Sequence, residues 1–503
     1  MRNRLWSWDK VSVTCLLMIV LSTSFAVEVP IEDFSIKAYP QNINEYLPPD
    51  SADYNQALLS SEYQQTQVQQ FFNHYYASDN KGLSPWSESM IRAVLPSVKK
   101  IELALLDEFD NQQQGPAQQH YGEHFKEHDE IWLNKMRTTM ALEGLESQTF
   151  NPQNNAIVVT NTAARALPDT APDFYHFSLA GQGFPFDNLQ ESALWVGTPL
   201  HVLHVSRDKA WSLVLSPDGY FGWVKSNDIA YASAAFIQQW QNKARQGLMA
   251  ITQTESSVLD KGQHFLFSAY IGAVFPLAQQ SEHQTTIFIP IKNSAQQALM
   301  STATIAKNAA HLMPMPASKK TIAALIKQLQ NRPYGWGGAY FFNDCSQELK
   351  SLFTPLGIWL PRNSAQQGKS SSLDLSSKTL DERLNLLQSK GHPLMTLIYI
   401  GGHVMLYLGN KPNKKEEQEA ITYQNVWGLS PASKDKRFVI GQSLLIPLLK
   451  SYAEHPEASS LADKAYFKLV FLDELSSSLP SPQAFANQLM GTLNTMEESN
   501  EPL

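Results

Sequence analysis

Cysteine is almost absent from this sequence, and charge is scarce. The 503 residues include two cysteines, too few for a disulfide framework or a four-cysteine zinc site. Charged residues make up 17% of the chain and the net charge is −8, so bulk electrostatics do not favour nucleic acid as a partner. The hydrophobic fraction of 43% excludes a wholly disordered chain. At roughly 100–200 residues per domain, the length predicts three or four domains.

The first cysteine, Cys15, lies in a segment with the pattern of a signal peptide. A basic start is followed by an apolar run over residues 11–21 and by small residues that end at Ala26, which predicts a signal peptide over residues 1–26. The run is about half the length of a membrane span, which needs roughly 20 apolar residues, so no span is expected after cleavage. We therefore expect an exported protein, periplasmic or fully secreted, whose one remaining thiol is Cys345.

The rest of the chain divides into four parts and a tail. The first part has a helical pattern, with Ser84 and Pro85 as a predicted helix start. The second and third have short apolar runs between turn residues, typical of small β-barrels, although residues 301–310 fit either a strand or a helix. The fourth is mixed, and the Ser/Pro-rich tail should be weakly ordered. The predicted boundaries are 27–150, 151–235, 236–312, 313–475 and 476–503.

Cys345 has the surroundings of a nucleophile. It follows a glycine-rich loop over residues 333–338, which lets backbone approach a substrate closely. Asn343 or Asp344 can cap a helix that begins at Cys345, and the positive end of the helix dipole would lower the pKa of the thiol. A buried structural cysteine is the alternative, but the polar neighbours of Cys345 favour a nucleophile.

Two histidines are candidates for the base that a cysteine nucleophile needs. His403 follows two glycines and opens an apolar strand, whereas His392 lies in a turn. A hairpin turn centred between residues 413 and 414 would place Gln424 opposite His403, where the amide can orient the imidazole. A register slip of one residue would favour Asn425 instead.

A zinc site is a competing interpretation. His124, Glu127 and His128 spell the H-x-x-E-H pattern of inverted zinc peptidases. On a helix the two histidines would share a face, but no third ligand is identifiable. A polar segment with chance histidines is the simpler interpretation.

Taken in order, these segments resemble a known family. The loop that begins at Tyr334, the Asp-Cys-Ser helix start, the Gly-Gly-His strand and the Gln-Asn-Val-Trp-Gly strand are similar to those of NlpC-type cell-wall cysteine peptidases. Residues 183–224 also resemble the first bacterial SH3-like domain of one subfamily. That subfamily has a helical N-terminal stabilising domain, two SH3-like barrels and a papain-like catalytic domain. The resemblance therefore implies a multidomain α+β fold with this domain order.

The resemblance also implies a site and a substrate. The triad would be Cys345, His403 and Gln424, although this subfamily usually has histidine at the third position. The substrate would be a peptidoglycan stem peptide, cleaved between γ-D-glutamate and a diamino acid through an acyl-enzyme, with no metal or cofactor. A non-catalytic scaffold that binds cell wall through its SH3-like domains is the alternative. The residues implied to bind substrate are Tyr334, Asp344, Ser346, Arg362 and Ser364.

Overall fold

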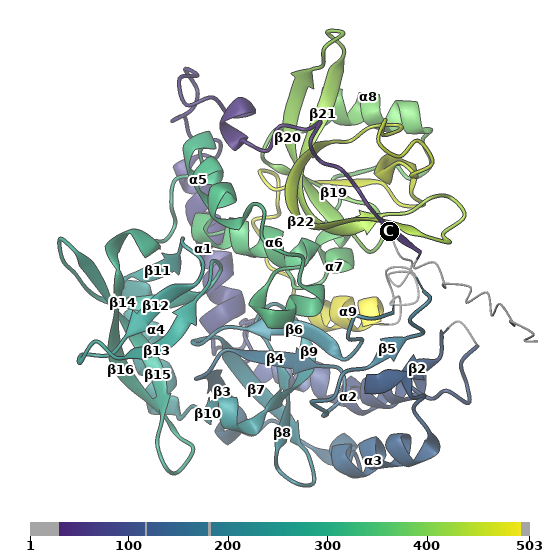
Figure 1. Cartoon of the computed structure of the whole chain (residues 1–503). Helices are drawn as coiled ribbons and strands as arrows, with labels where there is room; N and C mark the ends of the chain where they lie inside the picture. Colours follow the sequence, from purple (N-terminus) through teal and green to yellow (C-terminus); the bar gives the residue numbers. More distant parts are fainter. Residues whose placement is uncertain (1–29, 116–117, 180–182, 494–503) are drawn as a thin grey trace, which may run out of the picture.

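The computed structural model describes residues 30–115, 118–179 and 183–493. The predicted signal peptide, including Cys15, lies outside the described residues. Within this part of the chain, no helix combines the length and apolar character needed to cross a bilayer. The described chain builds helices and three seven-stranded sheets (Figure 1), which confirms the multidomain α+β class.

Helices dominate the N-terminal part, as predicted, but one of them begins later than expected. The second helix starts after Ser87, whereas Ser84 holds the preceding turn: its hydroxyl donates to the Tyr75 carbonyl and accepts from the Trp86 N–H. The serine-proline signal therefore marks a turn before the helix rather than its cap. The helices are α1 (Ser61–Tyr76), α2 (Glu88–Glu108) and α3 (Glu130–Met140).

Residues 30–59 pack against the C-terminal part of the chain. Strand β1 (Ile31–Asp33) pairs in parallel with the start of β22 and forms one edge of its sheet. Leu47 and Leu59 are buried in the same hydrophobic core as Cys345. Figure 1 shows this purple segment running along β22. The beginning of the chain thus completes the domain that carries the predicted site.

Two barrel-like sheets follow. The first has the order β10-β3-β7-β8-β9-β4-β6, and the second has the order β13-β12-β16-β15-β14-β11-β17. Residues 301–310, which fit either structure, lie mainly in strand β16. The second barrel is preceded by an unpredicted helix that Ser233 caps. Strands β2 (His120–Tyr121) and β5 (Phe174–Tyr175) form a separate two-stranded sheet. The elements of the barrels and of the connecting helix are β3 (Asn155–Val158), β4 (Thr162–Arg165), β6 (Gln190–Leu194), β7 (Pro199–Val205), β8 (Trp211–Leu215), β9 (Phe221–Lys225), β10 (Ile229–Tyr231), α4 (Ala234–Gln246), β11 (Leu248–Ile251), β12 (Ser256–Leu259), β13 (Phe265–Ala269), β14 (Val274–Gln280), β15 (Gln284–Lys292), β16 (Ala298–Ala306) and β17 (Ala310–Leu312).

The C-terminal domain packs helices against a third sheet, of order β1-β22-β21-β20-β19-β23-β18. Its core lies between α5, α6 and the strands, and contains Cys345 itself. The helices and strands are α5 (Lys319–Leu329), α6 (Cys345–Phe353), α7 (Ser364–Lys369), β18 (Leu373–Asp374), α8 (Leu380–Lys390), β19 (Thr396–Tyr399), β20 (Val404–Pro412), β21 (Gln418–Leu429), β22 (Arg437–Pro447) and β23 (Lys468–Phe471).

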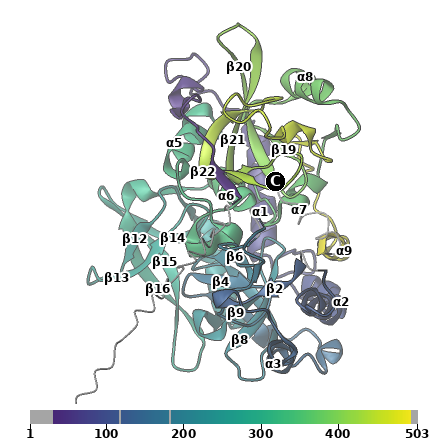
Figure 2. The same ribbon diagram turned by 45° about the vertical axis from the view of Figure 1, so that its right-hand side comes forward.

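The described part of the tail, up to residue 493, differs from the expectation of weak order, and residues 494–503 lie outside the described residues. Residues Pro482–Leu493 form helix α9, which lies against α2 (Figure 2). Phe485 and Leu489 are 6% and 2% exposed and belong to the core that surrounds Trp223 of the first barrel. The apolar residues at helical spacing within the Ser/Pro-rich segment explain why this part of the tail is ordered.

Candidate active site

Cys345 begins helix α6, as the sequence predicts. Asp344 is the cap, and its side chain accepts a hydrogen bond of 2.9 Å from the Gln347 N–H. The thiol is 6% exposed, and its Sγ lies 4.0 Å from the Gly402 carbonyl oxygen. The nucleophile candidate therefore meets the backbone immediately before His403.

His403 is oriented by Gln424. The Nε2–H of the fully buried imidazole donates to Oε1 of Gln424 over 2.7 Å. The amide is itself held, because Nε2 of Gln424 donates to the Thr422 hydroxyl (3.0 Å), which donates to the Ile446 carbonyl (2.8 Å). This relay leaves Nδ1 of His403 without a hydrogen-bond partner among the described residues. Nδ1 is thus the nitrogen available to accept a proton.

The contact between His403 and Gln424 was predicted, but not the register that produces it. The strands pair Leu406 with Tyr423, and the loop between them spans residues 413–417. Continuing this register places Val426, not Gln424, opposite His403. Gln424 lies two residues away on the same face, so the two side chains meet diagonally. A two-residue error in register keeps the face, which explains why the contact survives it.

The alternative residues have other partners. Asn425 points to the opposite side of β21, and its Nδ2 donates to the Asn343 carbonyl oxygen over 2.8 Å. His392 Nδ1 lies 2.9 Å from the carboxylate of Asp473. Geometry therefore favours His403 and Gln424 over His392 and Asn425 as the companions of Cys345.

The predicted lowering of the thiol pKa is wrong. Burial raises the pKa of Cys345 to about 12, and the charge of Asp344 adds to the rise. Burial lowers the pKa of His403 to about 4, against the hydrogen bond to Gln424, which raises it. In the free site the pair is a neutral thiol beside a neutral imidazole, because desolvation outweighs the helix dipole.

Arg362 was expected to bind substrate directly, but all of its N–H groups have partners. Nη1 and Nη2 form two hydrogen bonds with the Asp344 carboxylate, of 3.1 and 2.6 Å, and Nη1 also donates to the Ser346 hydroxyl. Nε donates to the Ser192 hydroxyl and Nη2 to the Glu191 carbonyl oxygen, both in strand β6. Since a guanidinium has five N–H donors, this side chain fastens the site to the first barrel.

The first barrel also places polar groups that the sequence did not single out. The Tyr220 hydroxyl donates to the Glu191 carboxyl group, and burial raises the pKa of both. Arg362 acts on both groups electrostatically. Neither residue lies in a recognisable motif, because the signal is a contact between domains rather than a spacing along the chain.

Tyr334 and Ser364 border the site without joining this network. The Tyr334 N–H donates to the Gly441 carbonyl oxygen, and burial together with the charges of Cys345 and Asp344 raises the pKa of its phenol. Ser364 is 8% exposed at the start of α7.

The glycine-rich loop approaches a protein neighbour. A Cβ atom on Gly337 would lie 1.9 Å from the Gln190 carbonyl oxygen, and one on Gly338 would lie 2.7 Å from the Ala193 nitrogen. Both glycines have positive φ values. The Gln190 side chain also donates to the Gly337 carbonyl over 2.9 Å. The expectation that these glycines admit substrate is therefore replaced by close packing against β6.

A buried carboxyl group supports the segment before the nucleophile. Asn343 Nδ2 donates to Glu348 over 2.7 Å, and the Tyr423 hydroxyl donates to the same carboxyl group. Burial raises the pKa of Glu348 to about 7. With Asn425 bound to its backbone carbonyl, Asn343 is held from two sides, which fixes the path of the chain into Cys345.

The H-x-x-E-H motif does not form a helical pair of ligands. His124 has a φ of 64° in the short turn Glu123–Phe125, whereas His128 precedes α3 and stacks on Trp132 with ring centroids 3.8 Å apart. Nε2 of His128 lies 3.1 Å from the buried carboxylate of Asp173. The zinc interpretation therefore lacks its geometric basis.

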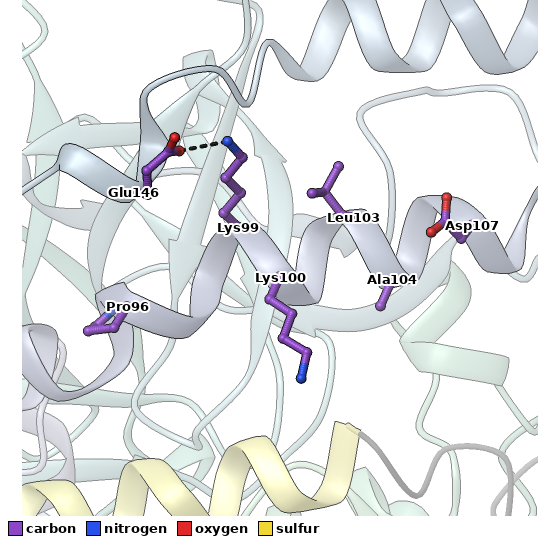
Figure 3. Close-up of a pocket in the computed structure, with 7 residues that line it drawn as sticks. All are labelled: Pro96, Lys99, Lys100, Leu103, Ala104, Asp107 and Glu146. Carbon is purple, nitrogen blue, oxygen red and sulfur yellow. Dashed lines mark hydrogen bonds and ion pairs between the residues drawn. The ribbon is translucent and has the colours of Figure 1, made fainter.

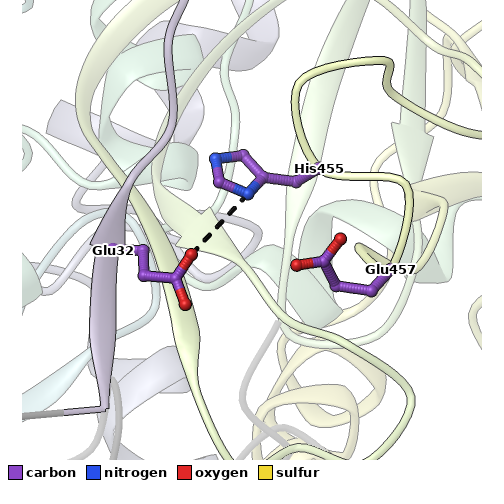
Figure 4. A group of neighbouring side chains, drawn as sticks. All are labelled: Glu32, His455 and Glu457. Atoms are coloured by element: carbon purple, nitrogen blue, oxygen red, sulfur yellow. Dashed lines mark ion pairs between the residues drawn. The ribbon is translucent and has the colours of Figure 1, made fainter. Parts of the chain in front are cut away.

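Two other features lie away from the site formed by Cys345, His403 and Gln424. Glu32, His455 and Glu457 form a group with metal-ligand chemistry (Figure 4), but the Lys436 ammonium lies 3.0 and 3.3 Å from the two carboxylates. A pocket of about 480 Å³ lies along α2 (Figure 3), and none of the predicted site residues lines it. Its lining residues are Pro96, Lys99, Lys100, Leu103, Ala104, Asp107 and Glu146.

Cys345 begins a helix that packs against the sheet. The histidine of that sheet, His403, is held by the side-chain amide of Gln424. This arrangement defines a papain-like α+β domain. The domain is joined to two SH3-like barrels. Residues 172–225 match the family model for an SH3 domain of SH3b1 type, and residues 233–282 match that for an SH3 domain of SH3b2 type. The chain is 26% identical to the solved structure of an NlpC/P60 endopeptidase from Photobacterium damselae subsp. piscicida, with a TM-score of 0.73, over 86% of this chain and 97% of that one. These findings confirm the resemblance to NlpC-type proteins with two SH3-like domains.

Other comparisons give weaker matches. An NlpC/P60 family protein from Bacillus cereus is 16% identical, with a TM-score of 0.41, over 61% of this chain and 98% of that one. NlpC2 from Trichomonas vaginalis is 10% identical, with a TM-score of 0.24, over 64% and 98%. No curated protein matches the chain significantly.

Proposed function

We propose that this protein is a cysteine endopeptidase of peptidoglycan stem peptides that cleaves the bond between γ-D-glutamate and a diamino acid. The likeness to an NlpC/P60 endopeptidase over most of both chains supports a cell-wall peptidase in general. One observation carries the catalytic assignment: Nδ1 of His403 has no hydrogen-bond partner among the described residues, while Gln424 holds the ring through Nε2. The Cys345 thiol contacts the backbone immediately before this histidine.

The proposed chemistry starts from a neutral pair. As Sγ of Cys345 attacks the γ-glutamyl carbonyl carbon, its proton passes to Nδ1 of His403, and the C=O electrons move to the oxygen. In this proposal the Cys345 N–H donates to that oxyanion, and the Tyr334 hydroxyl assists. The imidazolium then protonates the leaving amine as the C–N bond breaks. His403 next takes a proton from water as the water oxygen attacks the thioester carbon. The C–S bond breaks to release the acid, and the imidazolium returns the proton to the Cys345 sulfur.

The polar side chains near the thiol are proposed to bind the substrate. Ser346 and Ser364 remain the proposed partners of the glutamate carboxylate, although Ser346 must first turn its O–H away from Asp344, to which it donates over 3.2 Å. Asp344 remains the proposed partner of a free stem amine. Arg362 holds Asp344 and Ser346 in place rather than donating to substrate, since its donors are already used. Glu191 adds a second carboxyl group on the barrel side of the site.

Mass spectrometry of products from defined tri- and tetrapeptide stems tests the proposal. The wild type should release L-Ala-γ-D-Glu and a fragment that begins with the diamino acid, whereas Cys345→Ala and His403→Ala should release neither. His392→Ala is the matched control, because that imidazole pairs with Asp473 away from the thiol. Retained cleavage in a correctly folded Cys345→Ala variant would overturn the mechanism. Binding of intact wall without any released fragment would favour a scaffold.

A further inference from the structure

The first residue of β22, Arg437, is buried, and the two terminal nitrogens of its guanidinium have no partner among the described residues. Its side chain is 2% exposed, and neither Nη1 nor Nη2 has a hydrogen-bond partner among the described residues. Other buried arginines of this domain are fully engaged: Arg362 bonds Asp344, and Arg383 donates to four backbone carbonyls. Arg437 differs from these arginines because no residue within the described part of the chain accepts a hydrogen bond from its Nη1 or Nη2.

A second unpartnered polar group lies just beyond the end of β21. Strands β21 and β22 pair as far as Leu429 with Phe438, and extending that register by one residue sets Ser430 against Arg437. Opposed side chains share a face and lie about 5 Å apart at Cβ. Ser430 is 2% exposed, and its hydroxyl also lacks a partner within the described part of the chain. The two residues thus offer several N–H donors and one O–H donor to the same space.

The acidic partners of the adjacent Lys436 lie on the other face of β22, and Asp33, which pairs with Val439 on the Arg437 face, makes no hydrogen bond with Nη1 or Nη2 of Arg437 among the described residues. The ammonium of the adjacent Lys436 pairs with Glu32 and Glu457 and lies 5.0 Å from the ring centroid of Phe438. Figure 4 shows these two carboxylates with His455 at this surface. Because side chains alternate along a strand, Arg437 points away from this group.

An unpaired buried guanidinium is costly. Burial lowers the pKa of Arg437 to about 10, and no carboxylate acts to raise it. The group therefore stays charged at neutral pH, and its desolvation is offset only when an anion accepts its hydrogen bonds. The site is close to the surface, since Ile31, the Cα partner of Arg437 in the edge strand, is 45% exposed.

We propose that Arg437 and Ser430 form a binding site for an oxyanion, either a carboxylate or a phosphate group. The planar guanidinium suits bidentate recognition of either group, and the serine hydroxyl adds a third donor. This site is distinct from the proposed peptidase centre, and its test does not depend on activity.

Thermal unfolding of the full chain tests the proposal. Titration with sodium phosphate or sodium acetate, against sodium chloride at matched ionic strength, should raise the Tm of the wild type saturably with at least one oxyanion. A response to phosphate alone assigns a phosphate-bearing ligand, and a response to acetate assigns a carboxylate. In Arg437→Met the saturable rise should vanish, and Ser430→Ala should need a higher concentration of the same anion.

Lys436→Met is the matched control, because it removes a neighbouring cation that already has carboxylate partners. It should keep the anion response. Without added oxyanion, Arg437→Met should unfold at a higher temperature than the wild type, since an apolar chain replaces an unpaired charge. An equal response to chloride, or an unchanged response in Arg437→Met, would overturn the site.

Discussion

Cys345 stands at the positive end of α6, where two effects act on its thiol in opposite directions. The helix dipole stabilises a nearby negative charge by about 0.3–1 kcal/mol. Burial and the charge of Asp344 raise the thiol pKa from 9.0 to about 12, which corresponds to about 4 kcal/mol against the thiolate. Desolvation is the larger effect, so we expect the nucleophile to lose its proton during attack rather than before it.

The rate of alkylation tests this state of the thiol. Iodoacetamide should modify Cys345 slowly at pH 7, and the rate should keep rising up to pH 10, because only the thiolate reacts. The same chain unfolded in denaturant provides the control, with an ordinary thiol of pKa about 8.5. A rate that levels off near neutral pH in the folded protein would show a stabilised thiolate.

The acid side of the activity profile depends on His403. The imidazole must be neutral to accept the thiol proton, and burial lowers its pKa to about 4. We expect kcat/KM for a stem peptide to remain high as the pH falls through 6.5, the ordinary histidine value, and to decline only near pH 4. Stopped assays across this range, with recovery of activity checked at pH 7, measure it. An acid limb near 6.5 would contradict this environment.

In the proposed mechanism, Thr422 is a positioning residue that acts through Gln424. Its hydroxyl donates to the Ile446 carbonyl and so can only accept from the Gln424 amide, which aims Oε1 at His403. Thr422→Val should lower kcat by about 10–100-fold with little change in KM, whereas Thr422→Ser should retain activity. Equal kcat values for the Val and Ser variants would show that Thr422 does not position the amide.

At the scale of elements, the loop before α6 and strand β6 are built to touch. Gly337→Ala places a Cβ atom 1.9 Å from the Gln190 carbonyl oxygen at a φ of +54°. The variant should lose about 1–3 kcal/mol of stability and most of its activity, because the loop must move away from the barrel. Gly115→Ala is the control, since its added carbon meets no atom within 4 Å among the described residues outside its chain neighbours. Chemical denaturation of both variants measures the difference.

The elements that the sequence predicts are those with local signals. A capped helix start at Cys345 and an apolar strand after His403 depend on neighbours in the chain, and both are present. The hairpin register was wrong for two reasons: the 413–417 loop centres the turn on residue 415, and a bulge between Tyr407 and Gly409 then shifts the pairing by one residue. Neither has a simple local signal. Arg362, Glu191 and Gly337 could not be interpreted correctly, since their partners come from a different domain.

At the scale of the whole molecule, the site is held between domains. The ammonium of Lys350, on α6, lies 2.8 Å from the Asp218 carboxylate in the β8–β9 turn. On the opposite side, residues 30–59 bury Ile43, Leu47 and Leu59 in the core that includes Cys345. The papain-like domain therefore depends on chain segments that lie outside its predicted boundaries.

Substitution in the N-terminal segment tests this dependence. Leu47→Ala, at a site that is 3% exposed, should destabilise the C-terminal domain by about 2–5 kcal/mol. Removing residues 30–59 should leave that domain unable to fold, because total stabilities are only about 5–15 kcal/mol. Ile131→Ala, at a side chain that is 78% exposed, should change little. Denaturation followed by iodoacetamide labelling of Cys345 reports on this domain directly.

The parallel pairing of β1 with β22 also orders events during synthesis. Residues 31–33 are made early, yet the strand they join begins at Arg437, in the last third of the chain. The sheet edge must therefore stay open while both barrels and helix α6 are translated. A nascent chain that already contains Cys345, His403 and Gln424 can still lack strand β22 and the β1–β22 pairing at the edge of the sheet. The site proposed from Cys345, His403 and Gln424 therefore has its complete supporting sheet only after nearly all of the chain has been translated.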